Sequence, residues 1–147
     1  MKTILEFTEL LKEISKIEDV DFSGIGLILY SSLDNLDFIL MKDNTILSNK
    51  LVKGKSELLA FIQEISHHNN YFHDGFHLIN EKLELTHLSA FVSPKIDKDL
   101  IVLDEYGSRY RTAVYSSLSP GIIAIGVIGK TYGPFIVQNG KICKLNL

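Results

Sequence analysis

Cysteine is nearly absent from this sequence of 147 residues, which contains only Cys143. A single thiol cannot form an internal disulfide, so packing must hold the fold together, and the composition fits a reducing compartment. We interpret Cys143 as a small apolar residue in a terminal strand, because no cluster of positive charge lies beside it in the sequence.

An excess of positive charge is also missing. The chain has 15 Lys and Arg against 18 Asp and Glu, which gives a formal net charge of -3. Proteins that bind duplex nucleic acid or an anionic membrane present a strongly basic face. We therefore expect no DNA, RNA or membrane partner, and any anion must be bound by a local group of residues.

Long apolar runs are the third absence. The longest, GIIAIGVIG at 121–129, is about half of the ~18 to 20 residues that a membrane helix needs. Glu6, Glu9 and Glu13 interrupt the region where a signal peptide would be apolar. We therefore expect a cytoplasmic protein. With 46% hydrophobic and 22% charged residues, the chain can form a packed core, and we expect one globular domain over residues 1–147.

The spacing of apolar residues predicts two helices and two strands in the first half of the chain. The first helix covers 3–17, inside an N-terminal helical region of residues 1–20, and Thr3 with Glu6 has capping-box spacing. Short apolar runs at 23–32 and 37–43 have the length of core strands. Helical periodicity returns at 55–70, with Ser56 as the expected N-cap.

The second half of the chain is richer in strands. Two strands around the NEK turn at 80–82 suggest a hairpin, and a helix from Arg109 to Ser117 follows the loop PKIDKDLIVLDEYGS. After a strand at 122–128, Asn139-Gly140 between β-branched runs is a strong hairpin signal. The predicted class is α/β (α+β), a single domain with one twisted mixed sheet flanked by helices.

The histidines do not form a recognisable metal motif. His73 and His77 are four residues apart on an expected strand, roughly 13 Å, which is too far for one ion. His67 and His68 are adjacent on the expected helix and lack the i, i+4 spacing of a helical zinc site. We therefore interpret them as ordinary surface or half-buried residues.

Two short stretches are candidates for a binding site. Asp74-Gly75 stands at the start of an apolar strand, where it is either a turn or a point of close approach to a ligand. In GSRYRT at 107–112, Arg109 and Arg111 fall near a helix start if Ser108 is the cap, where the helix dipole disfavours cations. The arginines are either solvated or bind an anion such as phosphate with the helix N–H groups.

Together, HDGFHLI at 73–79 and YGSRYRTAVYSSL at 106–118 resemble the diadenylate cyclase domain family, whose motifs HDGA and G-[ST]-R-H-R-[AT]-A occur in the same order. The similarity extends from about Gly24 to Leu145. It implies a twisted mixed sheet wrapped by helices. It also implies two molecules facing each other, each with one ATP, that make cyclic di-AMP with a divalent metal, Mg²⁺ or Mn²⁺.

The resemblance assigns roles to individual positions. Asp74 would be the metal-binding and catalytic acid at the 3′-hydroxyl, and Gly75 the glycine of close approach. The expected phosphate grip comprises Ser108, Arg109, Arg111 and Thr112.

The sequence also departs from the family pattern. Phe76 replaces the alanine of HDGA and would reshape the nucleotide slot. Tyr110 replaces a histidine and would still offer a polar group to the nucleotide site. The family turn Ser-Glu-Glu-Thr-Gly aligns with GKTYG at 129–133, so Lys130 and Thr131 stand in place of acids. An ammonium beside a metal site opposes Mg²⁺ or Mn²⁺ binding.

Three hypotheses follow. The first is a catalytically degenerate domain that binds ATP or a cyclic dinucleotide and acts as a sensor or regulator, with a homodimer or higher homo-oligomer as its expected assembly. The second is an active diadenylate cyclase with a changed metal site. The third is a structural or interaction module that binds no nucleotide.

Overall fold

The computed structural model describes residues 2–102 and 105–146. Residues 103 and 104 of the predicted loop PKIDKDLIVLDEYGS lie outside the described residues. The helices are α1 (Lys2–Ser15), α2 (Lys55–Ile65), α3 (Gly107–Ser116) and the 3-10 helix η1 (Thr45–Ser48). The strands are β1 (Ile25–Tyr30), β2 (Phe38–Leu40), β3 (Phe76–Asn80), β4 (Leu85–Val92), β5 (Ile122–Ile128), β6 (Phe135–Gln138) and β7 (Lys141–Lys144).

All seven strands form one mixed sheet in the order β2-β4-β3-β1-β5-β6-β7. Only β1 and β3 run parallel, and every other neighbouring pair is antiparallel. The two predicted hairpins are present as β3–β4 and β6–β7. Asn139 and Gly140 have φ of 50° and 79° in the second turn, as a two-residue type I′ turn requires. The predicted α/β class with a mixed sheet and flanking helices is confirmed.

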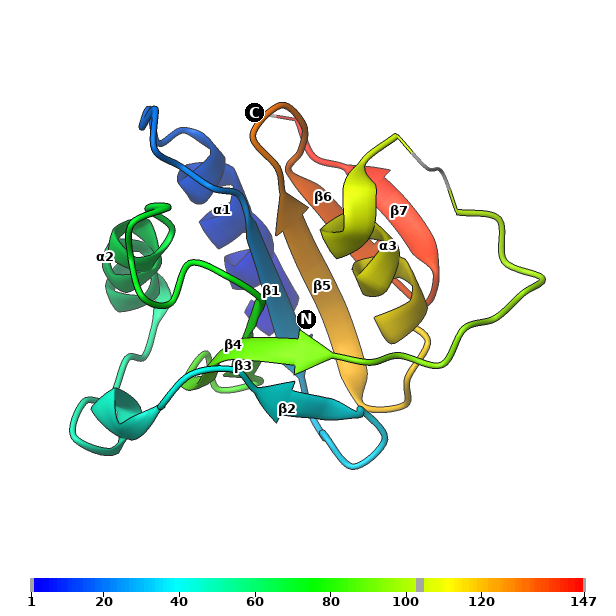
Figure 1. Ribbon diagram of the computed structural model, residues 1–147, viewed down its shortest axis with the longest axis horizontal. Coiled ribbons are helices and arrows are strands. Elements are labelled where there is room, and N and C mark those ends of the chain that lie inside the picture. Colours follow the sequence, from blue (N-terminus) through cyan, green and yellow to red (C-terminus); the bar gives the residue numbers. More distant parts are fainter. Residues whose placement is uncertain (1, 103–104, 147) are drawn as a thin grey trace.

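The sheet separates two hydrophobic cores (Figure 1). Helices α1 and α2 cover one face, where Phe7 and Ile62 are fully buried. Helix α3 covers the other face through Ala113 and Val114. Strand β1 lies between both cores, with Leu27 facing the first and Ile28 the second, which explains its continuous apolar run.

Three predicted helix starts differ from the structure. Thr3 lies inside α1, and its hydroxyl donates to the Glu81 carbonyl at 3.1 Å, so it forms no capping box. Gly54 is the N-cap of α2 in place of Ser56, since the backbone N–H of Gly54 is held by the carbonyl of Leu83. Helix α3 starts at Gly107, which places Ser108 inside its first turn.

The prediction of a helix to residue 70 is also wrong, because α2 ends at Ile65. The Ser66 hydroxyl donates to the Ile62 carbonyl at 2.6 Å, and the chain then turns. His67 pairs with Phe22 in an isolated β-bridge, and the His68 N–H donates to the Asp21 carbonyl. His67 and His68 therefore lie beyond the helix, against the segment that precedes β1.

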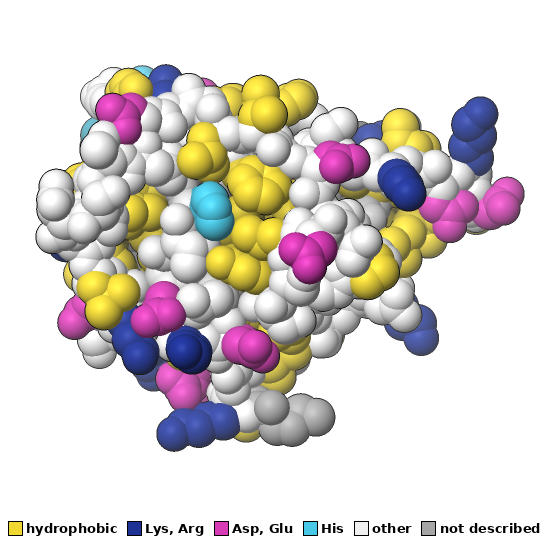
Figure 2. Space-filling view, turned by 90° about the horizontal axis from the view of Figure 1, so that it is seen from below, with side chains coloured by type: hydrophobic (Ala, Val, Ile, Leu, Met, Phe, Trp, Pro, Cys, Tyr) yellow, Lys and Arg dark blue, Asp and Glu magenta, His cyan; other side chains and the backbone are white. Residues whose placement is uncertain are grey.

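The predicted core strand at 37–43 and the terminal strand of Cys143 lie at the sheet edges. β2 is an edge strand of three residues, and Ile39 is 66% exposed. Cys143 is exposed on the opposite edge strand, β7, so it is not an apolar filler. Each of these strands pairs with a neighbour on one side only. Hydrophobic side chains also reach the surface on the underside of the molecule, around one histidine (Figure 2).

No helix within the described ranges is long and apolar enough to cross a membrane.

A buried histidine helps to shape β4. His77 is fully buried on β3, and its Nδ1 accepts the N–H of Ser89 at 3.1 Å. Ser89 has a φ of 56° at a point where β4 departs from regular pairing. His77 Nε2 has no hydrogen-bond partner among the described residues. Burial, assisted by the charge of Arg109, lowers the pKa of His77 from 6.5 to about 3, so the imidazole is neutral in the folded protein.

We expect His77 to make folding sensitive to acid. Below pH 6.5 the unfolded chain protonates this imidazole while the folded chain does not until about pH 3. The free energy of unfolding should therefore fall as pH drops, with a slope that approaches about 1.4 kcal/mol per pH unit from this residue. His77→Gln, which keeps an acceptor but does not titrate, should lose most of that slope between pH 6 and 5 in denaturant unfolding. Equal slopes for both proteins would contradict the role of His77.

Candidate functional site

A cleft of about 490 Å³ opens where β1 and β3 begin and β4 ends. The register places Gly26 beside Phe76, and Phe76 beside Ala90. The start of α3 completes the cleft. Six residues predicted from the sequence line it: Asp74, Gly75, Phe76, Ser108, Arg109 and Thr112. The fold thus joins two stretches that are more than thirty residues apart in the sequence.

A larger hollow, of about 810 Å³, lies between the end of α1 and the turn at 129–133. It contains none of the residues predicted for the nucleotide site. The candidate site is therefore the smaller cleft, which charged and polar side chains line.

Gly75 is required by the close approach of β4. Its φ is 80°, and an added Cβ would lie 2.7 Å from the Ala90 carbonyl oxygen and 2.8 Å from Met41 Cε. A side chain at this position would be strained and would collide with backbone. The close approach of β4 thus explains why a glycine stands at this position. Contact of Gly75 with a ligand remains a prediction.

Asp74 is the single carboxylate among the described residues that line the cleft. Its side chain is 60% exposed, and Oδ1 lies 3.5 Å from Nδ1 of His73. That His73 nitrogen is buried and has no hydrogen-bond partner in the described structure. Asp74 is therefore accessible to a ligand at the mouth of the cleft.

Arg109 brings positive charge into the cleft. One guanidinium nitrogen, Nη1, donates weakly to the carbonyl of Ser23 at 3.5 Å. No carboxylate in residues 2–102 or 105–146 lies within 4.0 Å of it. Burial lowers the pKa of Arg109, while Tyr132 and Asp74 act in the opposite direction. Arginine still stays protonated, so the cleft holds a partly buried cation without a close counterion.

The first turn of α3 adds backbone donors. Its N-cap residue is Tyr106, and no side chain in the described structure caps the helix. The first N–H groups of a helix lack intrahelical acceptors, so they can bind an anion. Ser108 and Thr112 are four residues apart and therefore share the face of α3 that borders the cleft.

Two predicted residues do not line the cleft. Tyr110 is 1% exposed and packs against Tyr106 and Phe135 in the second core, with ring centroids 4.9 and 5.7 Å away. Burial raises the pKa of its phenol. Arg111 is exposed on α3 and lies outside the cleft. A helix turns by about 100° per residue, so Arg109 and Arg111 cannot point the same way.

The alignment with the family turn suggests that Lys130 and Thr131 border the nucleotide site, but neither residue lines the cleft. Lys130 and Thr131 are exposed and border the larger hollow, whereas Tyr132 borders both the hollow and the cleft. The ring of Tyr132 lies against Gly129 and stacks on Phe135 at 5.4 Å. Among the described residues, an aromatic side chain rather than the Lys130 ammonium therefore reaches the cleft from this turn.

Sequence reasoning missed the apolar and aromatic wall of the cleft. Tyr106 precedes the GSR stretch directly, so its position gave a usable signal. Met41 follows β2 directly, Phe91 and Val92 belong to β4, and only strand register brings them to the cleft. The complete set of additional lining residues is Met41, Ala90, Phe91, Val92, Tyr106 and Tyr132.

The residues present do not fit a resident Mg²⁺ or Mn²⁺. Such ions take several oxygen ligands, and the cleft supplies one carboxylate, from Asp74. The guanidinium of Arg109 lies in the same cleft and repels a cation. A metal could bind here only together with the phosphates of a nucleotide.

Comparisons with known proteins support the fold. No protein-family model matches the chain, and no curated protein matches it significantly in sequence. The solved structure of a hypothetical membrane spanning protein from Bacillus cereus is similar over 100% of this chain, with a TM-score of 0.69 and 16% identity. This chain spans 65% of that protein's length.

The structure of a double mutant of DacA from Staphylococcus aureus, a diadenylate cyclase, is similar over 97% of this chain and 85% of the DacA chain. The TM-score is 0.60 and the identity 15%. At this identity the likeness shows the fold alone. The chain therefore has a diadenylate-cyclase-like fold, a single mixed α/β domain with a seven-stranded sheet and three helices.

Phe76 forms part of the cleft and is 4% exposed. A Cβ on Gly26 would lie 2.5 Å from its ring, so the ring covers that glycine on β1. We expect Phe76→Ala to cost ~3 to 5 kcal/mol of unfolding free energy, as for other buried aromatic truncations. We also expect the new space to tighten or newly permit adenine-nucleotide binding, measured by calorimetry.

Phe91→Ala is the matched control, because Phe91 also lines the cleft but is 57% exposed. It should change the free energy of unfolding far less than Phe76→Ala. If Phe76→Ala is destabilised and gains no nucleotide affinity, its ring serves core packing alone.

Proposed function

We propose that this protein is a diadenylate-cyclase-like domain that binds a nucleotide or cyclic dinucleotide and does not turn it over, so that it acts as a sensor or regulator. The observation that carries this proposal is Arg109, a partly buried guanidinium in a cleft, with no close counterion in residues 2–102 and 105–146. Such a cation is stabilised by an anion that forms charge-assisted hydrogen bonds with it.

Phosphate fits the surroundings of Arg109. The uncapped first turn of α3 offers backbone N–H groups, and Ser108 and Thr112 add hydroxyl groups on the same side. A planar guanidinium can form two parallel hydrogen bonds to phosphate oxygens. The group is therefore suited to a phosphate or a phosphodiester.

The aromatic part of the lining suits a nucleobase. Tyr106 and Tyr132 have ring centroids 5.0 Å apart, and both border the cleft. Met41 and Phe91 add apolar surface at its edge. Aromatic rings stack on bases with little dependence on base identity. A ligand with phosphate and base would contact both Arg109 and the aromatic rings.

Loss of turnover follows from the scarcity of acids. Transfer of a nucleotidyl group needs the phosphate charge to be stabilised and a hydroxyl group to be deprotonated. Asp74 would have to bind the metal and accept the proton, with no second carboxylate lining the described cleft. Binding needs only the Arg109 side of the cleft, so it can persist without catalysis.

A thermal-shift screen of ATP, other nucleotides and cyclic dinucleotides identifies the best ligand. A ligand that binds only the folded state adds about 2.7 kcal/mol of stability at a hundredfold excess over its Kd. Arg109→Ala should then weaken binding by about 1.5 to 3 kcal/mol, or roughly tenfold to 150-fold, measured by calorimetry. Arg109→Lys should recover only part of this loss, because the ammonium cannot form the paired hydrogen bonds.

Lys141→Ala is the control, since Lys141 is an exposed residue of β7 that does not line the cleft. It should leave the affinity unchanged. Wild-type affinity in Arg109→Ala with an intact fold would refute the phosphate-binding role of Arg109. An absence of any ligand in the screen would favour an interaction module.

We expect no cyclic di-AMP from ATP with Mg²⁺ or Mn²⁺, even at protein concentrations that favour dimers. High concentration is needed because turnover in this fold would require two facing copies. Chromatography of the reaction checks this expectation. Formation of cyclic di-AMP by the wild type, and its loss in Asp74→Asn, would show instead that the protein is an active diadenylate cyclase.

A further inference from the structure

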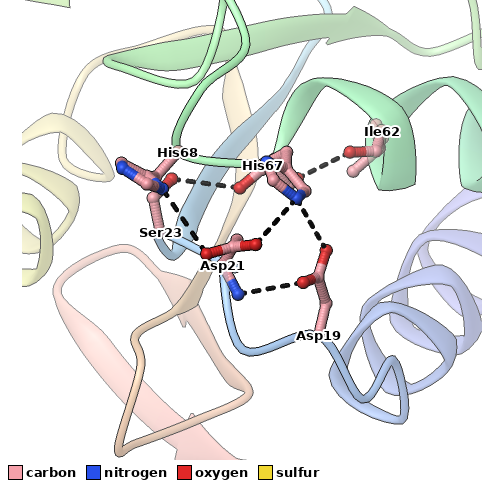
Figure 3. A network of polar contacts seen from close by, with 7 residues as sticks. Asp19, Asp21, Ser23, Ile62, His67 and His68 are labelled. Atoms are coloured by element: carbon pink, nitrogen blue, oxygen red, sulfur yellow. Dashed lines mark hydrogen bonds and ion pairs between the residues drawn. The ribbon is translucent and has the colours of Figure 1, made fainter.

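A second group of side chains lies near the start of β1, as the cleft does, but outside the cleft. Asp19 and Asp21 precede β1, and His67 follows α2 (Figure 3). One ligand atom from each of these three residues lies within 4.8 Å of the other two. We call this group the Asp19–Asp21–His67 triad. It combines an imidazole with two carboxylates, drawn from two segments that are far apart in the sequence.

The distances suit a common metal ion. His67 Nε2 lies 3.2 Å from Asp21 Oδ2 and 3.7 Å from Asp19 Oδ2. Ligands bound tetrahedrally at about 2.0 to 2.2 Å are separated from one another by about 3.3 to 3.6 Å. Small movements of the side chains would therefore bring all three atoms into coordination.

In each carboxylate, one oxygen faces His67 Nε2. The other oxygen contacts a group outside these three ligand atoms. Asp19 Oδ1 accepts the backbone N–H of Asp21 at 2.9 Å. Asp21 Oδ1 lies 3.8 Å from His68 Nδ1. Outer contacts of this kind orient metal ligands before the ion binds.

Backbone hydrogen bonds hold the two segments together. The His68 N–H donates to the Asp21 carbonyl at 2.8 Å, and the Ser23 N–H donates to the Ser66 carbonyl at 3.1 Å. The Ser66 hydroxyl donates in turn to the Ile62 carbonyl of α2. Binding an ion would therefore cost little rearrangement of the backbone.

We propose that Asp19, Asp21 and His67 form a binding site for a divalent transition-metal cation such as Zn²⁺, independent of the nucleotide cleft. Imidazole with carboxylates is a donor set that Zn²⁺ and its neighbours accept. The three side chains are 30 to 44% exposed, so an ion can enter and keep open positions for water. A bound ion would clamp the segment before β1 to the end of α2.

The experiment titrates the full chain with ZnCl₂ at pH 7.5 by calorimetry and thermal shift. We expect one saturable site and a raised Tm that EDTA reverses. His67→Gln and Asp21→Asn should each weaken Zn²⁺ binding at least tenfold. Glu18→Gln is the matched control, because it removes the same charge from the same segment without touching the triad. It should bind like the wild type.

Two further measurements test whether a different group of the protein binds the ion. Cys143→Ser removes the exposed thiol and should not change the affinity. Addition of Co²⁺ should give visible absorption bands that are lost in His67→Gln, which would show that the coordination of the ion depends on His67. Circular dichroism must show that the triad variants remain folded, and Asp19→Asn replaces a variant that does not. The proposal is wrong if no saturable binding is found, or if both triad variants bind Zn²⁺ with wild-type affinity. His67 would then only form ion pairs with the aspartates.

Discussion

Burial of β1 on both faces is the constraint on which the rest of this structure depends. A strand covered on both sides must have helices above and below it, and α1, α2 and α3 supply them. β1 also carries the parallel pairing with β3, which aligns the starts of the two strands. That alignment places Phe76 over Gly26, and the cleft opens at this end of the two strands.

The segment before β1 connects the two candidate sites. The carbonyl of Ser23 accepts the Arg109 hydrogen bond, and an added Cβ at Gly24 would lie 2.8 Å from Arg109 Nη1. Asp21, two residues earlier, belongs to the Asp19–Asp21–His67 triad. The position of Arg109 thus depends on how this short segment is held against the end of α2.

The chemistry of the cleft is asymmetric. Positive charge and backbone donors come from α3, apolar surface from β4 and from Met41 after β2, and aromatic rings from Tyr106 and Tyr132. A single acid, Asp74, lines the described part of it. This balance favours holding an anionic ligand over activating it, because binding needs fixed donors while nucleotidyl transfer also needs metal ligands and a base.

The sequence by itself determined the class of fold, most elements and both hairpins, because apolar periodicity and turn residues act locally. The two stretches that meet in the cleft were paired by their resemblance to the diadenylate cyclase motifs. The sequence located Asp74, Gly75 and Arg109, but placed Tyr110 and Arg111 beside them, since a motif does not state which face of a helix meets the cleft. It also treated His67 as an ordinary residue. Only the tertiary structure brought His67 to Asp19 and Asp21, and Met41 and Phe91 to Arg109, because strand register and the end of α2 are set by contacts between distant segments.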